Sequence, residues 1–182
     1  MSDEQQTAGK GQSPGAIAAQ WWRDHLADRG SGAARGLSAR LRRADGIAAL
    51  AEPQVIALAH RLRLGPPQAQ TLVRLVTVLA DVRVDDPQPL AARLGEPEPA
   101  LSALRFQRLL RADGDEFTRQ LRRALPMADR RCNVAWLAGD LLLWEHPDHG
   151  DRIRARWSFD YFGTSVPQIL RASAAAPSEE MS

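Results

Sequence analysis

Apolar residues recur every three or four positions along most of this chain, and this period limits the folds it can adopt. Within the stretch 68–82, Leu72, Leu75, Val76 and Leu79 fall at i, i+3, i+4 and i+7, which is the spacing of one helix face. Proline and glycine interrupt the pattern at short intervals, and no Asn-Gly or Asp-Gly hairpin turn stands between alternating apolar runs. The sequence therefore predicts an all-α fold.

The pattern predicts about eight or nine helices, arranged either as one helical bundle or as two small sub-bundles. The expected helices span 15–28, 34–44, 53–64, 68–82, 100–112, 116–125, 133–145 and 149–162, with one or two further turns at 90–94. The expected organisation is a disordered tail (1–14), an N-terminal helical part (15–82), an acidic proline-rich linker (83–99), a C-terminal helical part (100–163) and a mostly disordered tail (164–182).

Several classes of protein conflict with this sequence. Cys132 is the single cysteine, so the chain can form neither an internal disulfide nor a zinc site built on paired cysteines. The apolar runs fall far short of the roughly 20 residues that a membrane-spanning helix needs. The first residues include Asp3 and Glu4 and lack the apolar core of a secretory signal. We therefore expect a cytoplasmic protein without a membrane segment.

Charge is distributed unevenly along the chain. The formal net charge is only +2, yet all basic residues except Lys10 are arginine. GC-rich codon usage would produce the same ratio, so the positions of the arginines are more informative. Residues 23–63 hold eight arginines against four acids and residues 101–157 eleven against eight, whereas 64–100 hold three against five. Such segregation is typical of a surface that meets a polyanion.

The arginines form strips on the predicted helices. One strip lies opposite the apolar face of helix 116–125, a second lies opposite that of helix 100–112, and a third lies in helix 34–44. Their members are Arg119, Arg122 and Arg123; Arg105, Arg108 and Arg111; and Arg40, Arg42 and Arg43. Arg130 and Arg131 are expected to open the helix that carries Asn133. One strip alone is typical of a solvated face, but three favour phosphate contacts.

These basic faces lack the asparagine, glutamine and aromatic side chains that read bases, which favours binding of the nucleic-acid backbone without sequence readout. The prediction requires the guanidinium groups of the separate strips to converge into one continuous cationic track.

The sequence predicts no catalytic constellation, no metal site and no cofactor. The run His146-Pro147-Asp148-His149-Gly150-Asp151 has metal-ligand residue types, but it fits better as a polar inter-helix loop in which Asp148 caps the next helix. No G-x-S-x-G nucleophile motif is present.

The tryptophans are expected to fill the core. Trp136, Trp144 and Trp157 stand beside apolar residues that include Phe159, which favours core packing for all three. Trp21 and Trp22 are adjacent on one helix, so one is expected inside and the other is a candidate contact for a partner.

Three segments of the C-terminal half, in order, carry a resemblance: RFQRLLRADGDEFTRQLRRAL, CNVAWLAGDLLLW and RIRARWSFDYF. They resemble the CasB family, the small α-helical subunit of the type I-E CRISPR surveillance complex, Cascade. The matching positions are Arg105-Phe106, Leu121-Arg122-Arg123, Asn133, Leu137, Asp140-Leu141, Trp144, Trp157 and Asp160-Tyr161-Phe162. The resemblance extends over about residues 15–163, with ARLRRA (39–44) and Trp21-Trp22 matching upstream. Ser158 and the acidic stretch 84–99 depart from the family pattern.

The resemblance implies a non-catalytic, all-helical protein that sits as a dimer within Cascade. Its partners would be the crRNA-binding backbone subunits, the large subunit, the crRNA and the target DNA, and its basic face would hold strands of the R-loop. Carried over by position, the nucleic-acid-binding residues would be Arg40, Arg42, Arg43, Arg105, Arg108, Arg119, Arg122, Arg123 and Arg131.

Two alternatives remain open at this point. A helix-turn-helix regulator would use the turn at Asp113-Gly114 and read bases with the following helix, which offers only arginines, Gln120 and Thr118. A helical protein–protein adaptor would direct its arginines at acidic protein surfaces.

Overall fold

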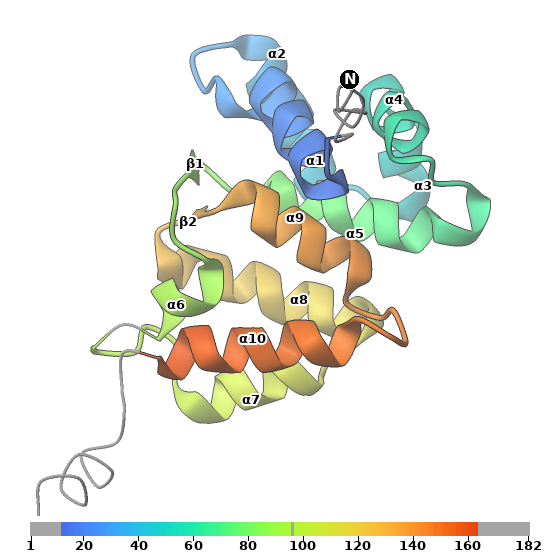
Figure 1. Cartoon of the computed structure of the whole chain (residues 1–182). Helices are drawn as coiled ribbons and strands as arrows, with labels where there is room; N and C mark the ends of the chain where they lie inside the picture. The colour runs from blue at the N-terminus through green and yellow to red at the C-terminus, as the bar shows by residue number, and fades with distance from the viewer. Residues whose placement is uncertain (1–11, 96, 164–182) are drawn as a thin grey trace, which may run out of the picture. The chain divides into compact units, whose positions relative to one another are not determined.

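The structure, a computed structural model, describes residues 12–95 and 97–163 and is almost entirely helical (Figure 1). Over these residues the chain forms ten α-helices: α1 (Pro14–Trp22), α2 (Gly32–Arg43), α3 (Gly46–Leu50), α4 (Pro53–Leu62), α5 (Ala69–Leu79), α6 (Leu90–Leu94), α7 (Ala103–Arg111), α8 (Gly114–Ala124), α9 (Val134–Leu143) and α10 (Gly150–Phe162). Shorter turns are the π-helical η1 (Arg23–Ala27) and the 3-10 turns η2 (Pro66–Gln68) and η3 (Leu125–Ala128). The all-α prediction is confirmed.

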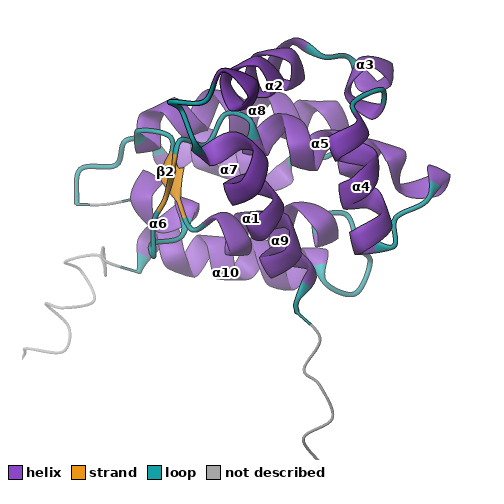
Figure 2. Cartoon of the chain, turned by 90° about the horizontal axis from the view of Figure 1, so that it is seen from above, coloured by secondary structure: helices purple, strands orange, loops and turns teal. Residues whose placement is uncertain are grey.

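Strand structure in the described part is confined to two short segments, β1 (Val84–Asp85) and β2 (Arg131–Cys132), which pair in parallel (Figure 2). The sequence did not predict them, because two residues carry no alternating pattern.

The chain divides into two compact units. Of the described residues, the first unit holds those up to Arg83 together with Val134–Leu142, and the second holds those of Val84–Asn133 and those from Leu143 onward. Within the first unit, Gly15 lets α1 approach α9 closely. A Cβ at Gly15 would lie 2.3 Å from the carbonyl oxygen of Ala135. Any side chain there would force the two helices apart.

Both tryptophans of α1 lie in the core of the first unit. Trp21 is 1% exposed and Trp22 is 3% exposed, so the expectation that one of them faces a partner is wrong. Their indole N–H groups donate in different directions, Trp21 to the carbonyl of Gln54 at 2.9 Å and Trp22 to the carbonyl of Leu79 at 3.1 Å. Helix α1 is buried on two sides, against α4 and α5, and adjacent positions can therefore both point inward.

Side chains from the first unit satisfy the carbonyl groups at the end of α5. Ser38 Oγ donates to the carbonyl of Ala80 at 3.0 Å, and Arg29 Nη2 donates to that of Val82 at 2.8 Å. Arg29 Nη1 also donates to Ser38 Oγ at 2.8 Å. This network fixes α2 against the end of α5, because the carbonyls there have no helical partner.

Stacked aromatic rings form the core of the second unit. Phe106 of α7 stacks on Tyr161 of α10 with ring centroids 3.9 Å apart, and Phe117 of α8 stacks on Trp144 at 4.0 Å. Trp157 meets Trp144 edge-on at 5.1 Å. These contacts hold α7, α8 and α10 together, and they agree with the core position expected for Trp144 and Trp157.

Arg154 of α10 anchors the end of α7. Its Nε donates to the carbonyl of Leu110 at 3.0 Å and its Nη2 to Asp113 at 2.6 Å. The guanidinium also lies 4.9 Å from the ring centroid of Trp144. One side chain therefore supplies a hydrogen bond to the helix end, an ion pair and a cation–π contact.

The acidic stretch after α5 contains the short helix that the sequence predicted at 90–94. It carries β1 and α6, whose Leu90 and Leu94 are buried. Gly95 touches α10, since a Cβ there would lie 2.1 Å from the carbonyl oxygen of Tyr161. The segment is thus part of the second unit.

The basic pair before α9 does not open a helix, contrary to the prediction. Asp129 and Arg130 adopt left-handed backbone conformations, with φ of 54° and 57°, and Arg131 then enters β2. Pairing with β1 holds the chain extended until Asn133, whose N–H donates to the carbonyl of Gln88 at 2.8 Å. Cys132 in β2 is fully buried, and burial raises the pKa of its thiol to about 12.

Two further predictions from the sequence are wrong. Trp136, which was expected in the core, is 53% exposed, because it points away from the buried face of its helix. Asp148 does not cap α10: His149 occupies the N-cap position, and no side chain there makes a capping hydrogen bond. The backbone N–H of Asp148 instead donates to His146 Nδ1 at 3.2 Å.

Candidate functional site

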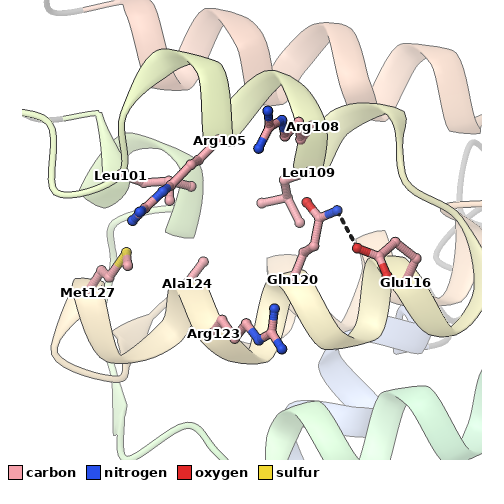
Figure 3. A pocket seen from close by; sticks show the side chains of 9 residues that line it. All are labelled: Leu101, Arg105, Arg108, Leu109, Glu116, Gln120, Arg123, Ala124 and Met127. Atoms are coloured by element: carbon pink, nitrogen blue, oxygen red, sulfur yellow. Dashed lines mark hydrogen bonds between the residues drawn. The ribbon is translucent and has the colours of Figure 1, made fainter.

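An open groove of about 450 Å³ runs between α7 and α8 in the second unit (Figure 3). Its apolar floor consists of Leu101, Leu109 and Ala124, with Met127 at one end. Arginines stand along both sides. The lining residues with polar side chains are Arg105 and Arg108 from α7 and Glu116, Gln120 and Arg123 from α8.

The helical period places these side chains. On α7, Phe106 and Leu109 are buried. Arg105 and Arg108 are three residues apart, so they lie on the same exposed side of the helix, next to the groove. On α8, Phe117 and Leu121 are buried, and positions 116, 120 and 123 share the side that faces α7. The same apolar periodicity that fills the core therefore lines the groove with cations.

The three arginines of the groove are exposed and have no bound carboxylate. Arg105, Arg108 and Arg123 make no hydrogen bond or ion pair with any residue in 12–95 or 97–163. Arginine stays charged at any physiological pH. Three positive charges without a bound acid over an apolar floor favour an anionic ligand that also has apolar surface.

One end of the groove carries the carboxylate of Glu116. Gln120 Nε2 donates to Glu116 at 2.8 Å, and Arg119 forms an ion pair with the same carboxylate. The amide of Gln120 and the charges of Arg119 and Arg123 lower the pKa of Glu116. The carboxylate is therefore ionised at neutral pH and repels anions from that end.

The arginines predicted from α2 belong to the first unit and differ in their contacts. Arg40 binds Glu52 with two hydrogen bonds, Nε to Oε1 at 2.5 Å and Nη2 to Oε2 at 2.9 Å. Arg42 is half-buried, and its Nε donates to the carbonyl of Ser38 at 3.3 Å. Arg43 is exposed at the end of the helix. A track that joins this strip to the groove stays a prediction.

The remaining predicted arginines lie in the second unit outside the groove. Arg119 pairs with Glu116, and Arg122 is half-buried on α8. Arg131 Nη2 lies 3.2 Å from Asp86 Oδ2, and Arg93 Nη2 contacts the same oxygen at 2.9 Å. The N–H of Gln88 and these two guanidinium groups lower the pKa of Asp86. Arg131 is thus one of three donors that bind the carboxylate of Asp86.

Sequence reasoning missed Glu52 and Asp86, which bind the predicted arginines Arg40 and Arg131, and it missed the apolar floor of the groove. Glu52 is 12 residues from Arg40, and Asp86 is 45 residues from Arg131, so no local pattern signals either pair. In the sequence, the residues of the floor could be recognised only as apolar positions of separate helices.

The polar side chains of α8 that could read bases are already engaged. Gln120 donates to Glu116, and Thr118 Oγ1 donates to the carbonyl of Gly114 at 3.1 Å. This arrangement does not present the free polar row on which a recognition helix depends.

Two further observations concern other chemistry. Within the described ranges, no three His, Cys, Asp or Glu side chains are grouped so that they could hold a metal ion. Among the helices of the same ranges, none combines the length and the apolar character of a membrane span.

Comparison with known families gives a match to the family described as CRISPR-associated protein Cse2, over residues 38–162. A CRISPR-associated protein Cse2 from Thermus thermophilus is 30% identical over 103 residues, which is 56% of this chain and 60% of that protein. The aligned part thus spans about three fifths of this relative.

Solved structures show the same likeness. The crystal structure of CasB from Thermus thermophilus is similar with a TM-score of 0.67 and 26% identity, covering 83% of this chain and 99% of that one. A second crystal structure, of a CRISPR-associated protein of the Cse2 family from the same organism, gives 0.66 and 25% with the same coverage.

Proposed function

Because the chain belongs to the CRISPR-associated Cse2 family, we propose that it is a non-catalytic small subunit of a type I-E Cascade complex that holds nucleic-acid backbone. Its partners would be the crRNA-binding backbone subunits, the large subunit, the crRNA and the target DNA, with two copies in each complex. It would act in the cytoplasm in antiviral defence. In such a complex guide pairing supplies sequence specificity, so a subunit that stabilises strands needs charge without base readout.

The observation that carries the proposal is the set of three arginines without a bound carboxylate, Arg105, Arg108 and Arg123, around the α7–α8 groove. Guanidinium groups fork onto phosphate oxygens, and several of them in one groove give an affinity that depends on salt rather than on sequence. The engaged side chains of Gln120 and Thr118 support backbone contact in preference to base contact.

The test measures binding of the full chain to labelled single-stranded and duplex DNA over a series of salt concentrations. The variant carries Arg105→Gln, Arg108→Gln and Arg123→Gln. We expect at least about tenfold weaker binding and a salt slope that falls by about 2, since each single-strand phosphate contact contributes about 0.7. The control variant, Arg61→Gln with Arg63→Gln and Arg83→Gln, makes the same change in net charge on exposed arginines of the first unit.

Equal losses in the two variants would reject the groove as the binding site and leave only a general charge effect. Strong preference for one duplex sequence would support a helix-turn-helix regulator instead. Unchanged affinity in both variants, or no binding by the wild-type chain alone or within its complex, would reject the nucleic-acid role and favour a protein adaptor.

A further inference from the structure

The outer face of α10 carries a stripe of two arginines and one phenylalanine that the proposed function does not use. At about 100° per residue, Arg152, Arg156 and Phe159 fall within an arc of about 60°. All three are exposed, and the opposite face buries Ile153, Trp157 and Tyr161. The core therefore fixes the orientation of the stripe.

Phe159 is an unusual surface residue in this molecule. Its side chain is 79% exposed, and its ring contacts no other ring in the described part of the chain. Phe162, one turn later, is 43% exposed, but its ring meets Phe106 at 6.2 Å and Tyr161 at 4.7 Å. Packing accounts for Phe162 and leaves the face of the Phe159 ring open to solvent.

The arginines give the stripe a preferred partner. Arg152 and Arg156 lie about 6 Å apart along the helix axis, and Phe159 lies about 4.5 Å beyond Arg156. Asp160, four residues after Arg156, flanks the stripe: burial raises the pKa of its carboxyl, and the nearby charge of Arg156 offsets part of that rise. Asp151 points to another side and lies 3.6 Å from Arg154. The stripe thus presents two exposed arginines followed by an exposed aromatic face.

We propose that this stripe is a second nucleic-acid contact, in which Phe159 stacks on an unpaired base while Arg152 and Arg156 bind adjacent phosphates. Duplex bases are already stacked on their neighbours, so an open aromatic ring favours a single strand. Arginine and an aromatic side chain together are the combination that single-strand binding surfaces use. The inference rests on the proposed nucleic-acid role but uses a surface separate from the α7–α8 groove.

The test compares Phe159→Leu and Phe159→Trp with the wild-type chain. Leucine keeps the apolar volume and removes the aromatic face, whereas tryptophan keeps a face for stacking. The probes are a labelled oligothymidylate and an abasic oligomer of the same length, which has the phosphates without the bases. We expect Phe159→Leu to bind oligothymidylate at least about fivefold more weakly and Phe159→Trp to bind within about twofold of wild type.

The abasic probe separates the contribution of base stacking from that of the phosphate contacts. Wild-type protein should bind it more weakly than oligothymidylate by the factor that Phe159→Leu loses, and Phe159→Leu should not distinguish the two probes. Thermal unfolding of each variant checks that the fold is intact. Because the Phe159 ring is exposed, we expect neither substitution to lower the unfolding temperature.

Unchanged affinity in Phe159→Leu would overturn the stacking proposal and assign the stripe to a protein partner, for which leucine is an adequate apolar contact. If the triple groove variant loses affinity while the Phe159 variants do not, the α10 contact fails and the proposed function stands. If no oligonucleotide binds, both fail.

Discussion

The arginines of α2 and those of the α7–α8 groove have similar sequence patterns but different surroundings. Arg40 lies in a basic run, and its guanidinium donates two hydrogen bonds to the carboxylate of Glu52. Arg105, Arg108 and Arg123 have comparable neighbours in sequence, yet no carboxylate of the described residues binds them. A cationic run therefore predicts a ligand site only where the fold brings no acid to it.

The largest effect on stability is expected for Arg154, which anchors the end of α7 beside the groove. Arg154→Ala removes the hydrogen bond to Leu110, the ion pair with Asp113 and the contact with Trp144. We expect the free energy of unfolding to fall by about 2–3 kcal/mol, since hydrogen bonds of charged groups contribute about 1.5–3 kcal/mol. Chemical denaturation measures this. Arg111→Ala, at an exposed position of α7, should change stability by less than about 0.5 kcal/mol. Equal stabilities of the two variants would show that α7 is held without Arg154.

The second prediction tests the comparison itself. Arg123→Gln should weaken single-strand binding about fivefold, which corresponds to about 1 kcal/mol. The charge-neutral double variant Arg40→Gln with Glu52→Gln should bind within about twofold of wild type, because Arg40 is already occupied. Fluorescence anisotropy with one labelled oligonucleotide measures both. A larger loss in the α2 variant than in the groove variant would reverse the assignment.

The third prediction releases Arg40 from its partner. Glu52→Gln should raise affinity about threefold and steepen the salt slope by about 0.7, since one more guanidinium becomes available. The stability cost should stay below about 1 kcal/mol, because Arg40 in this ion pair is more than half exposed. No gain in affinity, at unchanged fold, would mean that the position of Arg40 and not its pairing keeps it from the ligand.

The smallest effect concerns the end of the groove that carries Glu116. Glu116→Gln removes a carboxylate that repels anions and should raise affinity about twofold. Because the pKa of Glu116 is lowered, the wild-type carboxylate keeps its charge until the pH falls below the ordinary range for glutamate. Wild-type affinity should then rise as the pH falls further, while the Glu116→Gln variant lacks that rise. Parallel pH profiles would exclude a role for this carboxylate.

The sequence predicts the long helices well because their apolar period repeats over several turns. The five residues of α3 carry no such repeat, and Asp45, which caps the N–H of Ala48 at 2.8 Å, is their only local signal. The two strands pair across more than 40 intervening residues, as the contact of Asp85 with Cys132 shows, and no local rule predicts that. Trp21 and Trp22 show a further limit, since a helix buried on two sides has no outer face for either.

The site was predictable only in part. The helical period correctly places Arg105, Arg108 and Arg123 on the faces opposite the apolar stripes. Which arginines keep a free guanidinium depends on long-range partners such as Glu52 and Asp86, whose positions follow from tertiary packing. The groove itself depends on the separation of α7 and α8, which the aromatic core sets.

The burial of Cys132 affects how the native protein responds to thiol reagents. Only a thiolate attacks such reagents readily, and burial raises the pKa of the Cys132 thiol to about 12, so the thiol reacts only when the structure around it opens. Alkylation of the native chain therefore reports local opening around β2. If a second cysteine were introduced on the surface, a thiol reagent would label that cysteine and not Cys132 as long as the protein remains folded.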